Sequence, residues 1–371
     1  MLPTGLVAHE RYFWHDPGRG AGFSTSSIYV QPDRHPEDPD TKRRLLALLE
    51  VSGQVDHLLR IPPRPATMDE ILCFHTPRYI EHVRALSASV GGEAGDSATV
   101  GHGSYEIALL SAGGCLAAGE AVLSGRARNA YALVRPPGHH AEADSGRGYC
   151  LFGNAVILVN QARQKHGAAR VAVVDWDVHH GNGTESAFID DPSVLTISVH
   201  QDHNYPVDAG SLDVNGTGAG RGANINIPLP AGSGQGAYLA TFERVVVPAL
   251  LRFRPDLIVI ASGLDAAIID PIGRMLCTSE TYRLMTRLVM QAADEVCGGR
   301  IVATHEGGYS NAYVPFCGLA VIEELSGRRS PVIDPYLAEF EMMAGHALLP
   351  HQEAVIRAAA ELVARVPPGA G

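Results

Sequence analysis

The chain has 371 residues, of which 46% are hydrophobic, and its formal net charge is −11 at pH 7. This composition can fill a large core, and the length suits two domains or one large α/β domain. The acidic balance argues against non-specific nucleic-acid binding, which needs a basic surface. It suits a cationic substrate, or it only keeps the protein soluble.

Cysteine usage and the N-terminus indicate the compartment. Six cysteines stand at positions 73, 115, 150, 277, 297 and 317, and no two form a C-x-x-C pair. This spacing argues against a zinc ribbon, a thioredoxin motif or a disulfide framework, and free thiols indicate a reducing cytoplasm. No basic segment followed by an apolar core opens the chain, and no apolar run approaches eighteen residues, so we expect neither a signal peptide nor membrane association.

The predicted elements alternate between helices and strands along most of the chain. Irregular structure that wraps the domain is expected over residues 1–40, and loops over 91–103 and 200–222. The predicted helices are 41–51, 77–87, 104–125, 153–165, 237–252, 281–297 and 354–365, the last within a C-terminal segment of about 351–367. The predicted strands are 131–134, 171–175, 194–199, 224–227, 257–261 and 300–304. This alternation predicts one α/β domain over residues 1–371, with a mainly parallel sheet between two layers of helices.

The most informative stretch follows the apolar strand that begins at Val171. Five polar residues occur there within eight positions: Asp175, Asp177, His179, His180 and Asn182. Side chains two apart on an extended chain point the same way, so Asp177 and His179 converge just past the strand end. Open α/β sheets bind ligands at that edge, and a carboxylate with an imidazole is typical of a transition-metal site. The alternative is that these are ordinary polar residues of a loop that follows a strand. Five such residues within eight positions make this alternative less favourable.

Three further predicted strand ends carry unusual polar residues, at 136–140, 261–265 and 306–309. A metal held by Asp177, His179 and Asp265 would keep one position open for water, as catalytic sites do. Zinc suits two carboxylates and an imidazole, and Fe(II) and Co(II) suit them as well. The sequence therefore predicts metal-assisted chemistry at the carboxyl edge of the sheet.

The same strand ends offer proton-transfer groups. The adjacent His139 and His140 provide a general base and acid, and Tyr309, after two glycines, provides a donor to a developing oxyanion. Each residue alone has a structural alternative: turn polarity for the histidines, a helix N-cap for Asp265 and core packing for Tyr309. Their coincidence at four strand ends favours hydrolysis of an amide or ester.

These motifs occur in the order seen in one known family. They are Pro136-Pro-Gly-His-His140, Gly148-Tyr-Cys150, Asp175-Trp-Asp-Val-His-His-Gly-Asn-Gly183, Ser262-Gly-Leu-Asp265 and Glu306-Gly-Gly-Tyr309. The chain resembles histone deacetylases from about residue 20 to 327, and is most similar to the class II enzymes and the bacterial histone deacetylase-like amidohydrolases. The resemblance implies an open, mainly parallel sheet of eight strands of the arginase/deacetylase type and a bacterial source, and the cysteine pattern predicts a cytoplasmic protein. We also expect a homo-oligomer.

The resemblance also implies catalytic roles. His140 would be the general base and then the acid, and His139 would be its electrostatic partner, oriented by Asp175. Asn182 stands where class I enzymes carry an acid, so it should raise the basicity of the second histidine less than that acid would. Tyr309 would bind the carbonyl and the oxyanion. One Zn²⁺ per chain would be held by Asp177, His179 and Asp265.

Structural potassium ions are a further implication of the resemblance. One would lie near Asp175, Asp177, His179, Ser198 and Val199, bound partly by backbone carbonyls. A second would lie near Phe188, Asp191 and Val194.

The substrate channel departs from the family pattern. Gly148 would accept the substrate amide N–H through its carbonyl oxygen. Tyr149 and Tyr205 stand where the family usually has two phenylalanines, and Tyr149 is similar to the residue of acetylpolyamine amidohydrolases. The polyamine-selective class II member carries an acid at the channel mouth, where this chain has Ile272. The resemblance thus favours an acyl-lysine peptide or protein, or a similar small acetylated amide.

Three alternatives stay open. An acetylpolyamine amidohydrolase would use the same chemistry, and Glu93 or Asp96 of a partner subunit could supply its acid. An arginase-like ureohydrolase would need two metals, but Ala267 replaces a second metal-binding acid. A catalytically silent acyl-lysine binding module would not need the histidines and Tyr309.

Overall fold

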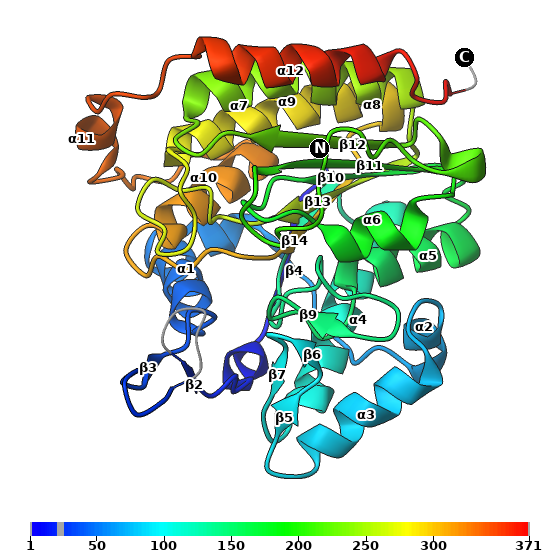
Figure 1. The fold of residues 1–371 in the computed structure, drawn as a ribbon, viewed down its shortest axis with the longest axis vertical. Helices are drawn as coiled ribbons and strands as arrows, with labels where there is room; N and C mark the ends of the chain where they lie inside the picture. The colour runs from blue at the N-terminus through cyan, green and yellow to red at the C-terminus, as the bar shows by residue number, and fades with distance from the viewer. Residues whose placement is uncertain (1, 21–25, 370–371) are drawn as a thin grey trace.

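The computed structural model describes residues 2–20 and 26–369, and its centre is one sheet of eight parallel strands (Figure 1). Their order across the sheet is β12 (Asn224–Leu229), β11 (Val194–Gln201), β10 (Val171–Asp175), β13 (Leu257–Ser262), β14 (Ile301–His305), β8 (Asn129–Leu133), β1 (Thr4–Ala8) and β4 (Leu59–Arg60). Every neighbouring pair is parallel. The predicted eight-stranded α/β sheet is confirmed.

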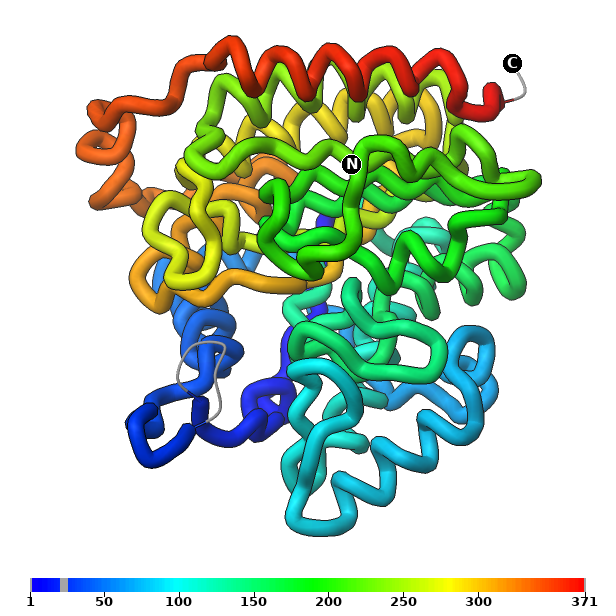
Figure 2. Tube along the Cα trace, viewed as in Figure 1, coloured from blue at the N-terminus to red at the C-terminus, as the bar shows by residue number. Residues whose placement is uncertain are grey.

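Alternating side chains of the strands reach two helix layers. In β10, Ala172 and Val174 join one core cluster, whereas Val171 and Val173 join the other. The first cluster is covered by α1 (Asp40–Val51), α7 (Gln235–Thr241), α8 (Val247–Phe253), α9 (Ser279–Cys297), α10 (Val314–Ser326) and α12 (Pro350–Val363), and α12 lies along α7 and α8 (Figure 2). The second is covered by α4 (Ser104–Leu123), α5 (Asn154–His166) and α6 (Asn182–Phe188). Burial on both faces explains why β10 and β13 are continuous apolar runs up to their last residue, whereas β11 and β12 alternate apolar residues with polar ones that are also buried.

Strand register gathers the polar strand ends. Asp175 pairs with Ser198 of β11 and Ala261 of β13, and Ser262 pairs with His305 of β14. The residues that follow β10, β13 and β14 therefore leave the sheet side by side at its carboxyl edge, where α/β proteins place their sites.

The expectation of irregular structure over residues 1–40 is wrong for Thr4–Ala8, which forms β1 between β8 and β4. Residues 1 and 21–25 of that expected wrap lie outside the described residues. The 91–103 loop contains the short strands β5 (Gly92–Glu93), β6 (Gly95–Asp96) and β7 (Thr99–Val100), and β6 pairs with β9 (Gly146–Arg147). The single helix expected over 237–252 is α7 and α8 joined by a π-helical turn at Phe242–Val246.

The remaining elements flank these layers. They are β2 (Arg19–Gly20), β3 (Asp33–Arg34), α2 (Met68–Leu72), α3 (Pro77–Ser87), α11 (Leu337–Glu341) and the 3₁₀ turns Glu10–Trp14, Gln54–His57 and Gly218–Gly220. Contrary to the expectation from apolar runs, α4 is long and apolar enough to cross a membrane by length and composition alone. In this fold 78% of its apolar window is buried against the protein, as in the core helix of an α/β domain.

Candidate active site

Asp177, His179 and Asp265 meet where β10 and β13 end. Each offers one ligand atom, and these atoms lie within 4.8 Å of one another at buried positions. His179 Nδ1 lies 3.0 Å from Asp177 Oδ1 and 3.2 Å from Asp265 Oδ2. Two main-chain donors hold the carboxylates, because Val178 N–H donates to Asp265 Oδ1 and Gly307 N–H donates to Asp177 Oδ2. The predicted ligand set is thus brought together.

This group fits a metal cation on its own chemistry. Asp265 Oδ2 is buried, and apart from His179 Nδ1 at 3.2 Å no described polar group lies in position to bond it. Burial, and then the charge of Asp177, raises the pKa of Asp265 to about 7 although His179 opposes the shift, as expected where two carboxylates are buried together. A Cβ at Gly307 would come within 2.1 Å of that oxygen, so glycine is needed there. Two carboxylate oxygens and one imidazole nitrogen match a zinc-class ion, which would neutralise them.

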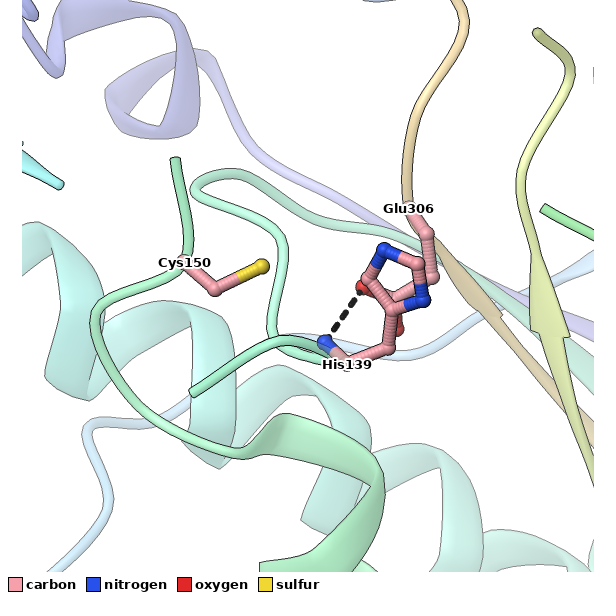
Figure 3. A group of neighbouring side chains, drawn as sticks. All are labelled: His139, Cys150 and Glu306. Atoms are coloured by element: carbon pink, nitrogen blue, oxygen red, sulfur yellow. Dashed lines mark hydrogen bonds between the residues drawn. The ribbon is translucent and has the colours of Figure 1, made fainter. Parts of the chain in front are cut away.

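A second group of potential ligands does not fit a metal. His139, Cys150 and Glu306 lie near one another, but in Figure 3 the His139 ring turns away from the sulfur. His139 Nδ1 is already bonded to Asp175, and both Glu306 oxygens accept protein hydrogen bonds. Burial raises the pKa of the Cys150 thiol well above its usual range, which opposes the thiolate that a metal needs.

The two adjacent histidines follow β8, and their ring centroids lie 3.9 Å apart with the ring planes tilted by 42°. His139 Nδ1 lies 2.9 Å from Asp175 Oδ2, and His140 Nδ1 lies 2.7 Å from Asn182 Oδ1. The structure therefore pairs each histidine with the partner expected from the sequence. Of the two, only His140 lines the pocket described below.

Asn182 determines which nitrogen of His140 carries the proton. Its amide nitrogen donates to His140 O and to Glu142 Oε1, which fixes the orientation of the amide. The amide oxygen then faces His140 Nδ1 and can only accept, so Nδ1 carries the hydrogen and Nε2 is left as a proton acceptor. Asn182 thus holds the tautomer that a general base requires.

The two histidines have opposite pKa shifts. Burial, with further contributions from His139 and His179, lowers the pKa of His140 well below its usual range. Burial also opposes charging of His139, but Asp177 and Asp175 outweigh it and raise the pKa of His139 to about 10. The arrangement gives a neutral base beside a cationic neighbour.

Tyr309 lies on the segment that follows β14 and lines the same pocket. Its N–H donates to Asp270 Oδ2, and its ring lies 5.9 Å from that of Tyr149 and 5.4 Å from Lys42 Nζ. Burial, with Asp265 next, raises the pKa of Tyr309 well above its usual range, so the phenol stays a donor. Asp270 was not recognised from the sequence as the residue that fixes the Tyr309 backbone.

A pocket with an empty volume of about 300 Å³, part of it open to solvent, leads to these groups. It contains all the predicted channel residues with three of the predicted catalytic and metal-binding ones: His140, Gly148, Tyr149, His179, Tyr205, Ile272 and Tyr309. Tyr149 adopts φ 68°, in the left-handed region that is unfavourable for a bulky residue. Tyr149 N–H donates to Ser97 O, which ties this strained position to the 91–103 loop.

The rim of the pocket contains residues that the sequence did not assign. Asp96 accepts a hydrogen bond of 2.9 Å from Tyr205 Oη, and Ser97 lines the pocket. The alternative in which Glu93 or Asp96 of a partner subunit supplies an acid is thus changed, because Asp96 of the same chain stands at the rim. Arg147 lies beside Asp96, with Nε 3.6 Å from Asp96 Oδ2. The sequence of the 91–103 loop has no periodicity from which its position beside the pocket could be predicted. The short pairing between β6 and β9 holds the loop there.

The residues proposed for potassium lie close to the site. Asp175 and Ser198 are paired in register, and both line a polar pocket of about 210 Å³ of empty volume. Val199, the next residue along β11, is buried. Near the second position, Asp191 N–H donates to Phe188 O, and Val194 N–H donates to Asp191 O. Structural potassium at either place stays a prediction.

The fold and the site together define an α/β protein with a candidate metal centre and a histidine pair at the carboxyl edge of a parallel sheet. A family model described as the histone deacetylase domain matches residues 35–325. The chain therefore belongs to the histone deacetylase family, which confirms the resemblance.

Relatives agree over nearly the whole chain. The histone deacetylase-like amidohydrolase of Pseudomonas aeruginosa is 49% identical over 348 residues, covering 93% of this chain and 91% of the relative. A probable deacetylase of Archaeoglobus fulgidus is 35% identical over 329 residues, covering 88% and 87%. The crystal structure of the HDA15 HD domain superposes with a TM-score of 0.84 at 31% identity, covering 97% of this chain and 96% of that one.

Proposed function

We propose that this protein is a zinc-dependent deacetylase that removes acetyl groups from acyl-lysine side chains. The observation that carries the proposal is the pocket itself. The pocket places His140 and Tyr309 beside His179. Of the two groups of potential ligands found among the residues that the structure describes, the one containing His179 fits a metal. A bound zinc ion would supply Lewis acidity to an amide carbonyl and acidify a water molecule. Asp177, His179 and Asp265 would hold it.

The protein's own groups account for proton movement. His140 Nε2 is the acceptor left by the Asn182 hydrogen bond, and the lowered pKa of His140 keeps it unprotonated at neutral pH. It takes a proton from the attacking water and delivers it to the amide nitrogen as the carbon–nitrogen bond breaks. His139, oriented by Asp175, stabilises the charges around this transfer.

Tyr309 stabilises the other end of the reacting amide. Its phenol donates to the carbonyl oxygen as negative charge develops there, and the raised pKa keeps the proton available. The segment before it contains two glycines, and Asp270 fixes its main chain. Oxyanion stabilisation therefore comes from a group that packing and hydrogen bonding already hold in place.

The channel favours an uncharged acyl-lysine stem. Its wall at Ile272 is apolar and buried, and Tyr149 and Tyr205 form further walls. Gly148 approaches His140 so closely that a Cβ there would lie 2.3 Å from the ring. The main chain at Gly148 can therefore reach the substrate amide, and its carbonyl oxygen is the acceptor that we assign to the amide N–H.

An acetylpolyamine is the second candidate, because the Asp96 carboxylate stands at the rim. Turnover should be measured on four substrates: an acetyl-lysine peptide, a trifluoroacetyl-lysine peptide, N-acetylputrescine and N-acetylspermidine. We expect the largest kcat/KM among the unactivated substrates for the peptide. A ratio of about ten or more in favour of N-acetylspermidine, or 1.4 kcal/mol, would show that the polyamine is the substrate class. No turnover of any acetamide would refute the deacetylase.

A further inference from the structure

Glu306 is a fully buried carboxylate that takes no part in the chemistry proposed above. It follows β14 and precedes Tyr309 by three residues. Its Oε2 accepts hydrogen bonds from Gly138 N–H at 2.7 Å and from His139 N–H at 3.1 Å. Figure 3 shows the second of these bonds, between the His139 main chain and the carboxylate. One oxygen thus holds two consecutive amides of the turn that carries both histidines.

The other carboxylate oxygen is also engaged. Thr304 Oγ1 lies 2.8 Å from Glu306 Oε1 and 3.4 Å from Ile260 O. Burial raises the pKa of Glu306 to about 7, so both charge states are accessible. In the neutral state the acid proton can sit on Oε1 and face Thr304, which leaves Oε2 as the acceptor for the turn. The hold on Gly138 and His139 therefore does not depend on the charge.

Three of the four residues in the segment 306–309 contact different parts of the site. Glu306 bonds the histidine turn, Gly307 N–H donates to Asp177 Oδ2, and Tyr309 N–H donates to Asp270 Oδ2. One short stretch of main chain therefore sets the relative positions of the proton acceptor, a carboxylate assigned to the metal, and the oxyanion donor. Chemistry of this kind tolerates little displacement, since an error of about 1 Å can cost about 10²-fold in rate.

On the basis of the deacetylase function proposed above, we propose that Glu306 is a positioning residue that sets the histidine turn against Tyr309 through its two main-chain hydrogen bonds. Without it, two buried N–H groups lose their acceptor, and the turn relaxes to find others. Substrate binding relies on the channel walls, so the loss falls on kcat.

The variants are Glu306→Ala, which removes the acceptor, and Glu306→Gln, whose carbonyl oxygen can accept both amides while its NH₂ group donates to Thr304. Glu323→Ala is the matched control, because Glu323 is a buried carboxylate on α10 that accepts from Ser330 N–H and does not line the pocket. Each variant is assayed for kcat and KM on an acetyl-lysine peptide, for metal content, and for amide hydrogen exchange of a peptide spanning 136–141.

We expect Glu306→Ala to lower kcat by about 10- to 100-fold with KM within about threefold, and to exchange faster over 136–141 with its metal retained. Glu306→Gln should stay within about threefold of the wild type in kcat, and Glu323→Ala should lose stability without losing kcat. If Glu306→Ala does not fold, Glu306→Asp, which withdraws the carboxylate by one methylene, must show the same loss.

Two results would overturn the proposal. One is a folded Glu306→Ala, or Glu306→Asp in its place, with wild-type kcat. The other is a Glu306→Gln variant as impaired as Glu306→Ala, which would assign the effect to charge. A wild-type protein without turnover would instead refute the deacetylase function, and the exchange experiment would still report on the hydrogen bonds.

Discussion

Tyr309→Phe is the most direct test of the proposed chemistry, because it removes one hydroxyl and little else. The contacts that place the ring survive the change: Tyr149 packs at 5.9 Å, Lys42 Nζ lies 5.4 Å from the ring centroid, and the main-chain N–H remains bonded to Asp270. A phenylalanine keeps all three. The stability of the protein should therefore change by no more than about 1 kcal/mol, the usual net worth of one hydrogen bond.

The kinetic effect should be much larger. Loss of one preorganised oxyanion donor costs about 10²- to 10³-fold in kcat, or about 2.7–4 kcal/mol. Burial raises the pKa of Tyr309, so the wild-type phenol is protonated across neutral pH, and the variant should be impaired equally at pH 6 and pH 8. KM should change less than kcat, because the bond strengthens as charge develops on the carbonyl oxygen.

The assay is steady-state hydrolysis of an acetyl-lysine peptide, followed by release of the free amine. Tyr149→Phe is the matched control, because it removes a hydroxyl from the neighbouring ring of the same pocket. We expect Tyr149→Phe to retain or raise activity on the plain acetyl-lysine peptide relative to polar amides. If Tyr309→Phe kept wild-type kcat on an unactivated acetamide, the oxyanion role would be wrong.

Three further outcomes are expected. Chelation should abolish turnover and lower the melting temperature, because an ion held only by the folded chain stabilises that chain; elemental analysis should give about one zinc-class ion per active chain, and a requirement for two would contradict the site. Ile272→Glu should shift the ratio of kcat/KM values between N-acetylspermidine and the acetyl-lysine peptide toward N-acetylspermidine by about 1–2 kcal/mol. An unchanged ratio would show that residue 272 does not contact the substrate at the channel mouth. Asn182→Asp should raise the pKa of His140, because a carboxylate would then face its Nδ1–H. Protonation would remove the base at a higher pH, so the acid limb of the pH–rate profile should move to higher pH. A limb that stays in place would mean that another group limits the rate.

The sequence predicted the centre of the site because local rules determine it. Asp177 and His179 are two residues apart at a strand end, and the parallel sheet brings Asp265 to the same edge. Strand alternation and the rule that α/β sites lie at carboxyl ends were enough to place these residues. The strand β1 was missed because five residues, Thr4–Ala8, carry too short a pattern, and only pairing with β8 and β4 makes them a strand.

The supporting contacts could not be predicted, since they join segments far apart in the chain. Glu306 bonds main-chain groups 167 and 168 positions away, and Asp270 bonds the Tyr309 main chain 39 positions away. Both acids are conspicuous in the sequence, since Glu306 lies inside a motif and Asp270 precedes a proline. What distinguished them was burial with several main-chain donors, a property of the folded chain.

The rim shows why substrate class depends on these distant contacts. Arg147 lies within 4.0 Å of three carboxylates, those of Asp96, Glu142 and Asp208, so this part of the rim carries net negative charge around one cation. Inside the pocket, Ile272 presents an apolar wall. The first ammonium of N-acetylputrescine lies about four methylenes from the amide, as Cα does in an acyl-lysine, so it would stand at the channel mouth between the neutral Ile272 wall, which offers it no charge, and the acidic rim. An acyl-lysine peptide leaves its stem in the channel and keeps basic flanking residues at the acidic rim, where opposite charges attract. Because the acidic rim attracts a polyamine as well as a basic peptide, the neutral wall at Ile272 is the feature on which our preference for acyl-lysine rests, and Ile272→Glu tests it directly.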